Sequence, residues 1–203
     1  MAGTPFENTR TPLKSWFYAM FLFCASRNGV SAKELERQLG VTYKTAWRMA
    51  RLIRAYMTAI DSDAPLGGPS GGVVEADKAF VGGKDKKGQD DKTIVLGMVE
   101  RGGEVITKIV PHRGSNAVIP QIAKWVKPGS RIATDTAKAF GELRELGYKH
   151  GQINHSAKEY VRGPVHTNTI EGFWNIFKRG VKGTYVWCSP KHLQLYLGEF
   201  EYR

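Results

Sequence analysis

Hydrophobic and polar positions in the first third of the chain follow the spacing of α-helices. Residues 12–28 predict a helix, because a proline stands near its start and a glycine follows its end. Aromatic side chains are spread around most of this segment, which favours a helix buried in a core. Its apolar stretch, Trp16 to Ala25, is too short to span a bilayer, so we expect no membrane partner.

Two further helices are predicted on either side of a tight turn at Gly40. A capping-box pattern, Ser31 to Glu34, opens a short helix through Leu39. The next helix covers residues 43–56, with Thr42 as its expected cap, and its cations are Lys44, Arg48, Arg51 and Arg54. Such a pair with a basic second helix is typical of a DNA-binding helix-turn-helix, although a plain helical hairpin with a solvated basic face has the same pattern. The predicted DNA contacts on the second helix are Tyr43, Lys44, Thr45, Arg48 and Arg51.

The pattern changes after a stretch rich in Gly, Pro, Ser and Asp. We therefore predict a helix-turn-helix domain at 1–62, a linker at 63–72 and a second domain at 73–203. Short apolar runs and turn signals in the second domain predict three meandering strands, then helix, strand, helix (137–146), strand and helix. This order is expected of a ribonuclease H-like fold. The predicted fold class is thus α/β, a ribonuclease H-like mixed sheet with flanking helices, preceded by an all-α domain.

Three carboxylates stand where this fold gathers functional groups. Asp77 lies on the first predicted strand, Asp135 ends the fourth strand, and Glu171 lies on the late helix. Together they predict a site for two divalent cations, Mg²⁺ or Mn²⁺, in phosphodiester chemistry. Glu75 shares the strand face of Asp77, where the pattern favours a solvent-exposed carboxylate over an accessory ligand.

The charge of the chain indicates its partner. A net charge of +11 and a pI near 9.7 point to a polyanion, most simply nucleic acid. The cysteines, Cys24 and Cys188, form neither a metal-binding spacing nor a disulfide framework, so we expect a cytoplasmic location.

Several motifs, in one order along nearly the whole chain, carry a resemblance to a known family: GTPFENTRTPLKSWF, TYKTAWRM, VEADKAFVGG, the TDT around Asp135, NHSAKEYV, HTNTIEGFWNIFKRG and SPKHLQLYLGEF. They resemble a bacterial insertion-sequence transposase of the DDE superfamily, and more narrowly the IS1595 (ISXO2-like) family. The 35 residues between Asp135 and Glu171, and the six between Glu171 and Lys178, are similar to the spacings of DDE transposases.

The resemblance implies cleavage of double-stranded DNA at transposon ends, followed by attack of the freed 3′-hydroxyl on target DNA. It implies metal ligands at Asp77, Asp135 and Glu171, with Asn168 as the rival to Glu171. The residue type of Asn168 favours a cap of the late helix instead. Phosphate contacts are expected from His166, Lys178, Arg179 and Lys182. A homodimer or higher oligomer on DNA is also expected.

One departure from the family pattern concerns the metal site. Lys78 stands beside Asp77 where the family usually has an acidic residue, and its charge would weaken divalent binding by repulsion. A second departure is Thr136, which stands where the family usually has an acidic residue. Both departures favour the alternative function, a catalytically lapsed or truncated copy that acts only as a DNA-binding protein.

Overall fold

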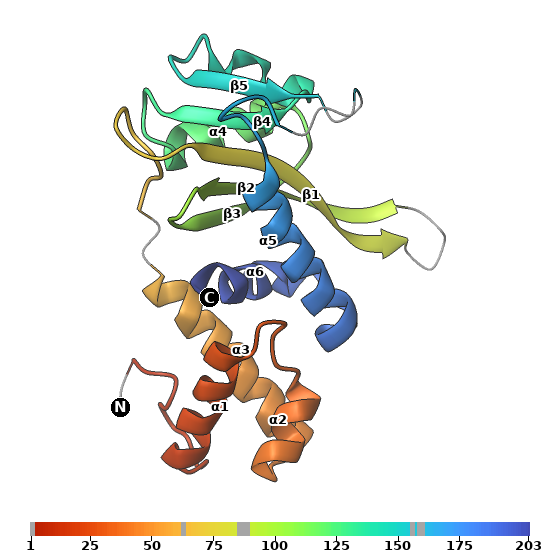
Figure 1. Ribbon diagram of the computed structural model, residues 1–203. Coiled ribbons are helices and arrows are strands. Elements are labelled where there is room, and N and C mark those ends of the chain that lie inside the picture. The colour runs from red at the N-terminus through yellow and green to blue at the C-terminus, as the bar shows by residue number, and fades with distance from the viewer. Residues whose placement is uncertain (1–2, 62–63, 85–89, 155–156, 158–160) are drawn as a thin grey trace. The chain divides into compact units, whose positions relative to one another are not determined.

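The structure is a computed structural model that describes residues 3–61, 64–84, 90–154, 157 and 161–203. The chain forms two compact units (Figure 1). One unit combines Met1–Ser62 with Ile176–Arg203, and the other is Asp63–Asn175. The predicted division at 63–72 assigns residues 176–203 to the second domain, whereas in the structure this segment packs with the N-terminal helices.

Three helices open the first unit: α1 (Leu13–Ala25), α2 (Ala32–Leu39) and α3 (Tyr43–Ile60). The two predicted caps are present. Ser31 Oγ accepts a hydrogen bond from Glu34 N (3.1 Å), and Thr42 Oγ1 accepts one from Thr45 N (3.3 Å). Gly40 ends α2 with a positive φ of 64°, which glycine adopts without the strain that a Cβ would bring.

The prediction that α1 is buried on most sides is wrong. Trp16, Ala19 and Phe23 are buried, whereas Phe17 and Phe21 are 59% and 62% exposed. The buried residues follow an i, i+3, i+7 pattern and face the core shared with α2 and α3. A unit of so few helices covers one face of α1 and leaves the opposite face in solvent.

The C-terminal segment of the first unit contains a π-helical turn, η3 (Gly180–Tyr185), a short 3₁₀ turn, η4 (Pro190–His192), and α6 (Leu193–Tyr202). Buried Arg54 donates from Nε to Glu199 Oε2 at 2.6 Å, and this ion pair joins α3 to α6. Arg54, which the sequence analysis counts among the cations of the basic helix, is therefore buried and does not belong to its exposed basic face. Tyr185 donates a hydrogen bond to the other oxygen of Glu199, at 2.6 Å.

The second unit is built on a mixed five-stranded sheet with the order β3-β2-β1-β4-β5 (Figure 1). The strands are β1 (Val74–Lys84), β2 (Asp90–Glu100), β3 (Val105–Val110), β4 (Arg131–Asp135) and β5 (Lys149–Ile153). β1, β2 and β3 pair antiparallel as a meander, whereas β4 runs parallel to both β1 and β5. The predicted order of strands and helices is confirmed, and it is compatible with a ribonuclease H-like fold.

Different helices cover the two faces of the sheet. On one face, α4 (Ser115–Trp125) and η1 (Lys138–Leu143) enclose the main core, which includes Val74 and Ala76. On the other, α5 (Asn168–Arg179) crosses β2 at Gly97, where an added Cβ would clash with the Trp174 ring. The predicted α-helix at 137–146 is wrong in type, since this segment is a short 3₁₀ helix followed by turns.

The predicted linker is held on the sheet unit over its described residues. Leu66 is buried and pairs with Val126 in an isolated bridge. The carboxylate of Glu100 accepts hydrogen bonds from Gly67 N (2.8 Å) and Gly72 N (2.9 Å). Among the residues described, no helix is both long and apolar enough to cross a membrane.

Candidate active site

The register between β1 and β4 brings two of the predicted ligands together. Val74, Glu75 and Ala76 pair with Ile132, Ala133 and Thr134. The next position on each strand is Asp77 and Asp135, so these aspartates lie side by side on one face. Both side chains are half-buried, and Asp135 Oδ1 accepts a hydrogen bond from Ala137 N at 3.0 Å.

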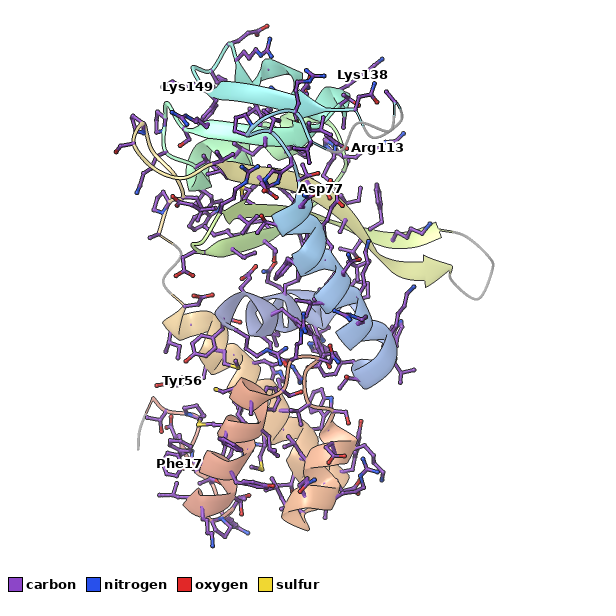
Figure 2. All side chains as sticks on the ribbon, in the orientation of Figure 1. Phe17, Tyr56, Asp77, Arg113, Lys138 and Lys149 are labelled. Carbon is purple, nitrogen blue, oxygen red and sulfur yellow. The ribbon has the colours of Figure 1, made fainter. Side chains whose placement is uncertain are left out.

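The third predicted ligand stands on the helix that crosses this face. Asp77 is paired with Gly97, the residue over which α5 packs through Ile170 and Trp174. Asp77 therefore lies beside the start of α5 (Figure 2). Glu171 follows Ile170 in the first turn of the helix, is exposed, and accepts a hydrogen bond from Thr167 Oγ1 at 2.9 Å.

Electrostatic coupling links the three carboxylates. The pKa of Asp77 is raised to about 6, first by burial and then by the charges of Asp135 and Glu171. A hydrogen bond from the backbone N–H of Lys78, and the Lys78 charge, act in the opposite direction. Such mutual repulsion between nearby carboxylates is relieved by a proton or by a cation.

The donor set fits a hard divalent cation. Three carboxylates offer the oxygen ligands that Mg²⁺ prefers, and Mg²⁺ keeps several waters and needs only one or two protein carboxylates. Among the described residues, however, no group of three or more His, Cys, Asp or Glu side chains is arranged to hold a metal ion. The carboxylate of Glu171 accepts a hydrogen bond from Thr167 Oγ1 instead.

The sequence interpretation of Glu75 as a solvent-exposed strand-end carboxylate is wrong. Glu75 is fully buried, and its carboxylate accepts hydrogen bonds from the backbone N–H groups of Thr169 and Ile170 (2.8 and 3.1 Å). It also accepts one from Arg101 Nε at 2.6 Å. His166 Nδ1 lies 3.1 Å from Glu75 Oε1 without hydrogen-bond geometry, so this predicted phosphate contact is directed toward a carboxylate. The only signal in the sequence was the two-residue spacing from Asp77.

Comparison with known proteins settles the family. The sequence profile of the ISXO2-like transposase domain matches residues 69–203, about two thirds of the chain. The chain belongs to the ISXO2-like transposase family. The predicted resemblance is thereby confirmed, and the matched domain contains Asp77, Asp135 and Glu171.

The chain is similar to two proteins with related descriptions. One is described as part of a transposable element, and the other is described as transposase-like. One, from Halobacterium salinarum, is described as an uncharacterized protein in transposable element ISH50. It is 27% identical over 210 residues, which cover 93% of this chain and 66% of the relative. The other, an uncharacterized transposase-like protein of Haemophilus influenzae, is 34% identical over 100 residues, which cover 49% of this chain and 80% of the relative.

The rival ligand, Asn168, is the first residue of α5 and is exposed. The expectation that Asn168 caps this helix is wrong, because the cap position belongs to Thr167, whose carbonyl accepts a hydrogen bond from Glu171 N at 3.0 Å. The predicted phosphate contacts Lys178, Arg179 and Lys182 are all exposed.

The candidate DNA contacts of α3 lie on the outside of the first unit. Tyr43, Lys44, Arg48 and Arg51 are exposed and Thr45 is half-buried. Lys44, Arg48 and Arg51 share one helical face by their spacing of four and three residues. The buried face of the same helix carries Ala46, Met49, Ala50 and Ile53.

Side chains alternate between the two faces of β1, so Lys78 points to the opposite face from its neighbour Asp77. Its Nζ lies 4.5 Å from the centre of the Phe140 ring, on the face opposite to Asp77. This cation–π contact directs the ammonium group away from the carboxylates, although its charge still acts on the pKa of Asp77.

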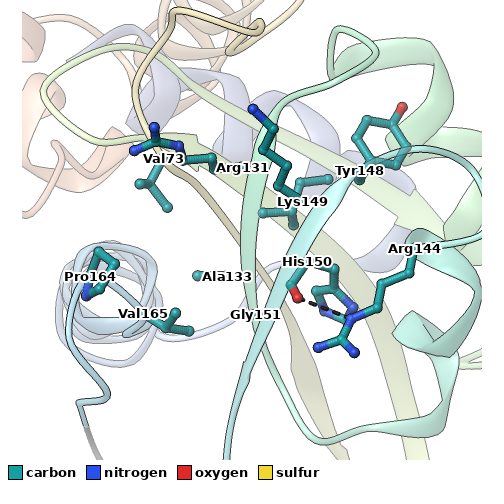
Figure 3. A pocket seen from close by; sticks show the side chains of 11 residues that line it. Val73, Arg131, Ala133, Arg144, Tyr148, Lys149, His150, Gly151, Pro164 and Val165 are labelled. Carbon is teal, nitrogen blue, oxygen red and sulfur yellow. Dashed lines mark hydrogen bonds between the residues drawn. The ribbon is translucent and has the colours of Figure 1, made fainter.

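A cavity of about 570 Å³ lies on the same unit but away from the carboxylates (Figure 3). It is lined by Arg131 at the start of β4, by β5 residues and by Pro164 and Val165, whereas Asp135 ends β4. His150, at its wall, has its pKa lowered to about 4 by burial and by Arg144, and it forms a 2.8 Å hydrogen bond with Thr134 Oγ1. This cavity is therefore not the candidate active site.

Proposed function

We propose that this chain is a DNA transposase that cuts the ends of an insertion element and joins the freed 3′-hydroxyl to target DNA. The observation that carries the proposal is that Asp77 and Asp135 lie side by side within the matched transposase domain, with the charge of Glu171 acting on the pKa of Asp77. The ribonuclease H-like fold is part of the same proposal, supported by the strand order and by the helices on both faces.

Asp77, Asp135 and Glu171 would hold Mg²⁺ or Mn²⁺. When bound, two such cations would activate the attacking hydroxyl and stabilise the leaving oxygen of a phosphodiester. The protein's own contribution is to keep the aspartates rigid on adjacent strands and to place Glu171 on a helix packed over them. The raised pKa of Asp77 supports this role, because burial and, after it, the charges of Asp135 and Glu171 disfavour an uncompensated carboxylate, which a cation would compensate.

Double-stranded DNA is the proposed partner. The net charge of +11 supports binding to a polyanion. We assign α2 and α3 as a helix-turn-helix in which Tyr43, Lys44, Thr45, Arg48 and Arg51 contact DNA. Lys178, Arg179 and Lys182 add a basic segment that would contact the phosphate backbone, and the active form would be an oligomer on DNA.

A DNA-binding protein without catalysis is the second candidate. It is favoured by the absence, within the described ranges, of a ready arrangement of three ligands, and by the charge of Lys78 near Asp77. Both candidates share the DNA-binding surface and differ only in cleavage.

The discriminating experiment is an assay on DNA that carries the terminal inverted repeats flanking the coding sequence. We expect binding by gel shift and strand nicking that requires Mg²⁺ or Mn²⁺ and stops with EDTA. Scrambled end sequence serves as the control. Binding without nicking at any concentration of either metal would support the second candidate and remove the first.

A further inference from the structure

Glu75 is a fully buried carboxylate two residues from Asp77 on the same strand face. Its Oε2 accepts the backbone N–H groups of Thr169 and Ile170, which belong to the first turn of α5. The first N–H groups of a helix have no carbonyl acceptor within the helix itself, so they need one from elsewhere. A carboxylate at this end also interacts favourably with the helix dipole. Glu75 therefore ties the start of α5 directly to β1.

A second set of contacts fixes the segment that leads into α5. Arg101 donates from Nε to Glu75 Oε1 at 2.6 Å. The two remaining guanidinium nitrogens of Arg101 donate to the carbonyls of Pro164 and His166, at 2.7 and 3.1 Å. One carboxylate and one guanidinium thus hold the approach to the helix and its first turn together.

These contacts exclude Glu75 as an accessory metal ligand. A carboxylate has about four lone-pair positions. Glu75 already accepts hydrogen bonds from Thr169 N, Ile170 N, Thr169 Oγ1 (3.0 Å) and Arg101 Nε. It has no position left for a cation without breaking the anchor of α5.

We propose that Glu75 is a positioning residue, which with Arg101 sets the placement of Glu171 relative to Asp77. Glu171 follows Ile170 directly, so the two hydrogen bonds of Glu75 fix the backbone one residue before the third proposed ligand. The inference rests on the proposed cleavage activity. A misplacement of a reacting group by about 1 Å costs about 100-fold in rate, and loss of this anchor is of that kind.

The test compares Glu75→Gln with Glu100→Gln. Both variants convert a carboxylate that accepts two backbone N–H bonds within the sheet unit, but Glu100 holds Gly67 and Gly72 rather than α5. We expect Glu75→Gln to lower the cleavage rate at saturating DNA and Mn²⁺ by about 10- to 100-fold, with unchanged affinity for DNA. Glu100→Gln keeps the wild-type rate.

Amide hydrogen exchange gives a readout that needs no catalysis. In Glu75→Gln the amides of Thr169 and Ile170 should exchange faster, while those of β2 stay protected. If Glu75→Gln does not fold, Thr169→Val is the test variant. Thr169 is exposed, and this change removes one hydrogen-bond donor to Glu75. We then expect a smaller loss of cleavage rate and a smaller increase in amide exchange.

The outcomes separate the two proposals. If the wild type cleaves and a folded Glu75→Gln variant cleaves at the same rate, the positioning role is overturned. If Glu75→Gln does not fold, an unchanged cleavage rate in Thr169→Val overturns it. Loss of stability without faster exchange at the start of α5 also overturns it. If the wild type does not cleave, the proposed function fails, and the exchange data alone support or reject the anchoring of α5 by Glu75.

Discussion

Two carboxylates on one face of β1, Glu75 and Asp77, lie in opposite environments. Glu75 is buried among donors, and four hydrogen bonds compensate its charge. Asp77 is half-buried near two further carboxylates, and its pKa is raised to about 6. A side chain whose charge is compensated holds structure in place, whereas one whose charge is not compensated can bind a cation.

The raised pKa of Asp77 predicts how stability depends on pH in the metal-free protein. Between pH 4 and 6 the folded state retains a proton that the unfolded state has lost, so this group makes stability fall as pH rises. Asp77→Asn removes the effect. The variant should therefore be more stable than the wild type at pH 7–8, by about 1 kcal/mol after allowance for solvent screening.

Thermal unfolding in EDTA at pH 4 and at pH 7.5 checks this prediction. The advantage of Asp77→Asn should shrink toward pH 4, and saturating Mn²⁺ should raise the melting temperature of the wild type alone. An Asp77→Asn variant that is less stable than the wild type at pH 7.5 would contradict the assignment of a repulsive carboxylate cluster.

The sequence was sufficient to place Asp77 and Asp135 on strands and Glu171 on a helix, because each lies in a segment with clear periodicity. It could not reveal the role of Glu75. The partners of this residue are 26 and 94 or 95 positions away in sequence, in a turn and at a helix start. Local patterns carry no information about such pairings.

At the scale of elements, caps and turn residues in the sequence predicted where the helices of the first unit begin. The sequence was less successful at predicting which helix faces are buried. α2 and α3 begin at their predicted caps, but α3 continues to Ile60, four residues past the predicted end. The predicted helix at 137–146 is a 3₁₀ segment that ends at Leu143 and is followed by a turn at Gly147, whose φ is 82°. Ala139, Phe140 and Leu143 are buried, so the apolar spacing that favoured a helix belongs to the 3₁₀ segment.

The exposed face of α3 carries a prediction about DNA binding. Lys44→Ala combined with Arg48→Ala should weaken binding to end DNA. The slope of the logarithm of the binding constant against the logarithm of the salt concentration should fall in magnitude by about one for each phosphate contact removed. Lys33→Ala with Arg37→Ala on α2 removes the same charge from exposed positions and is the control.

Fluorescence anisotropy across a salt series measures both quantities. An equal loss of affinity in the two double variants would mean that net charge alone drives binding. Unchanged binding in the α3 variant would show that α3 is not the recognition helix.

At the scale of the whole molecule, the chain folds as two units whose composition the sequence did not predict. Residues 176–203 pack with the first 62, through the ion pair of Arg54 and Glu199. The separation of 145 positions between these partners explains why a linear division at the linker missed the arrangement. The family domain, residues 69–203, therefore includes this C-terminal segment as well as the sheet.

The central claim is that Asp77, Asp135 and Glu171 together carry metal-dependent cleavage. It is tested most directly by nicking of end DNA in Mg²⁺ or Mn²⁺ with Asp77→Asn, Asp135→Asn and Glu171→Gln, beside Asn168→Ala. The three carboxylate variants should bind DNA normally, and their cleavage rates should fall by more than about 100-fold. This loss exceeds what is typical when a residue that only supports a metal ligand is changed. Asn168→Ala should cleave like the wild type. Full nicking by any carboxylate variant would remove that residue from the site, and an inactive Asn168→Ala beside an active Glu171→Gln would give the third position to Asn168.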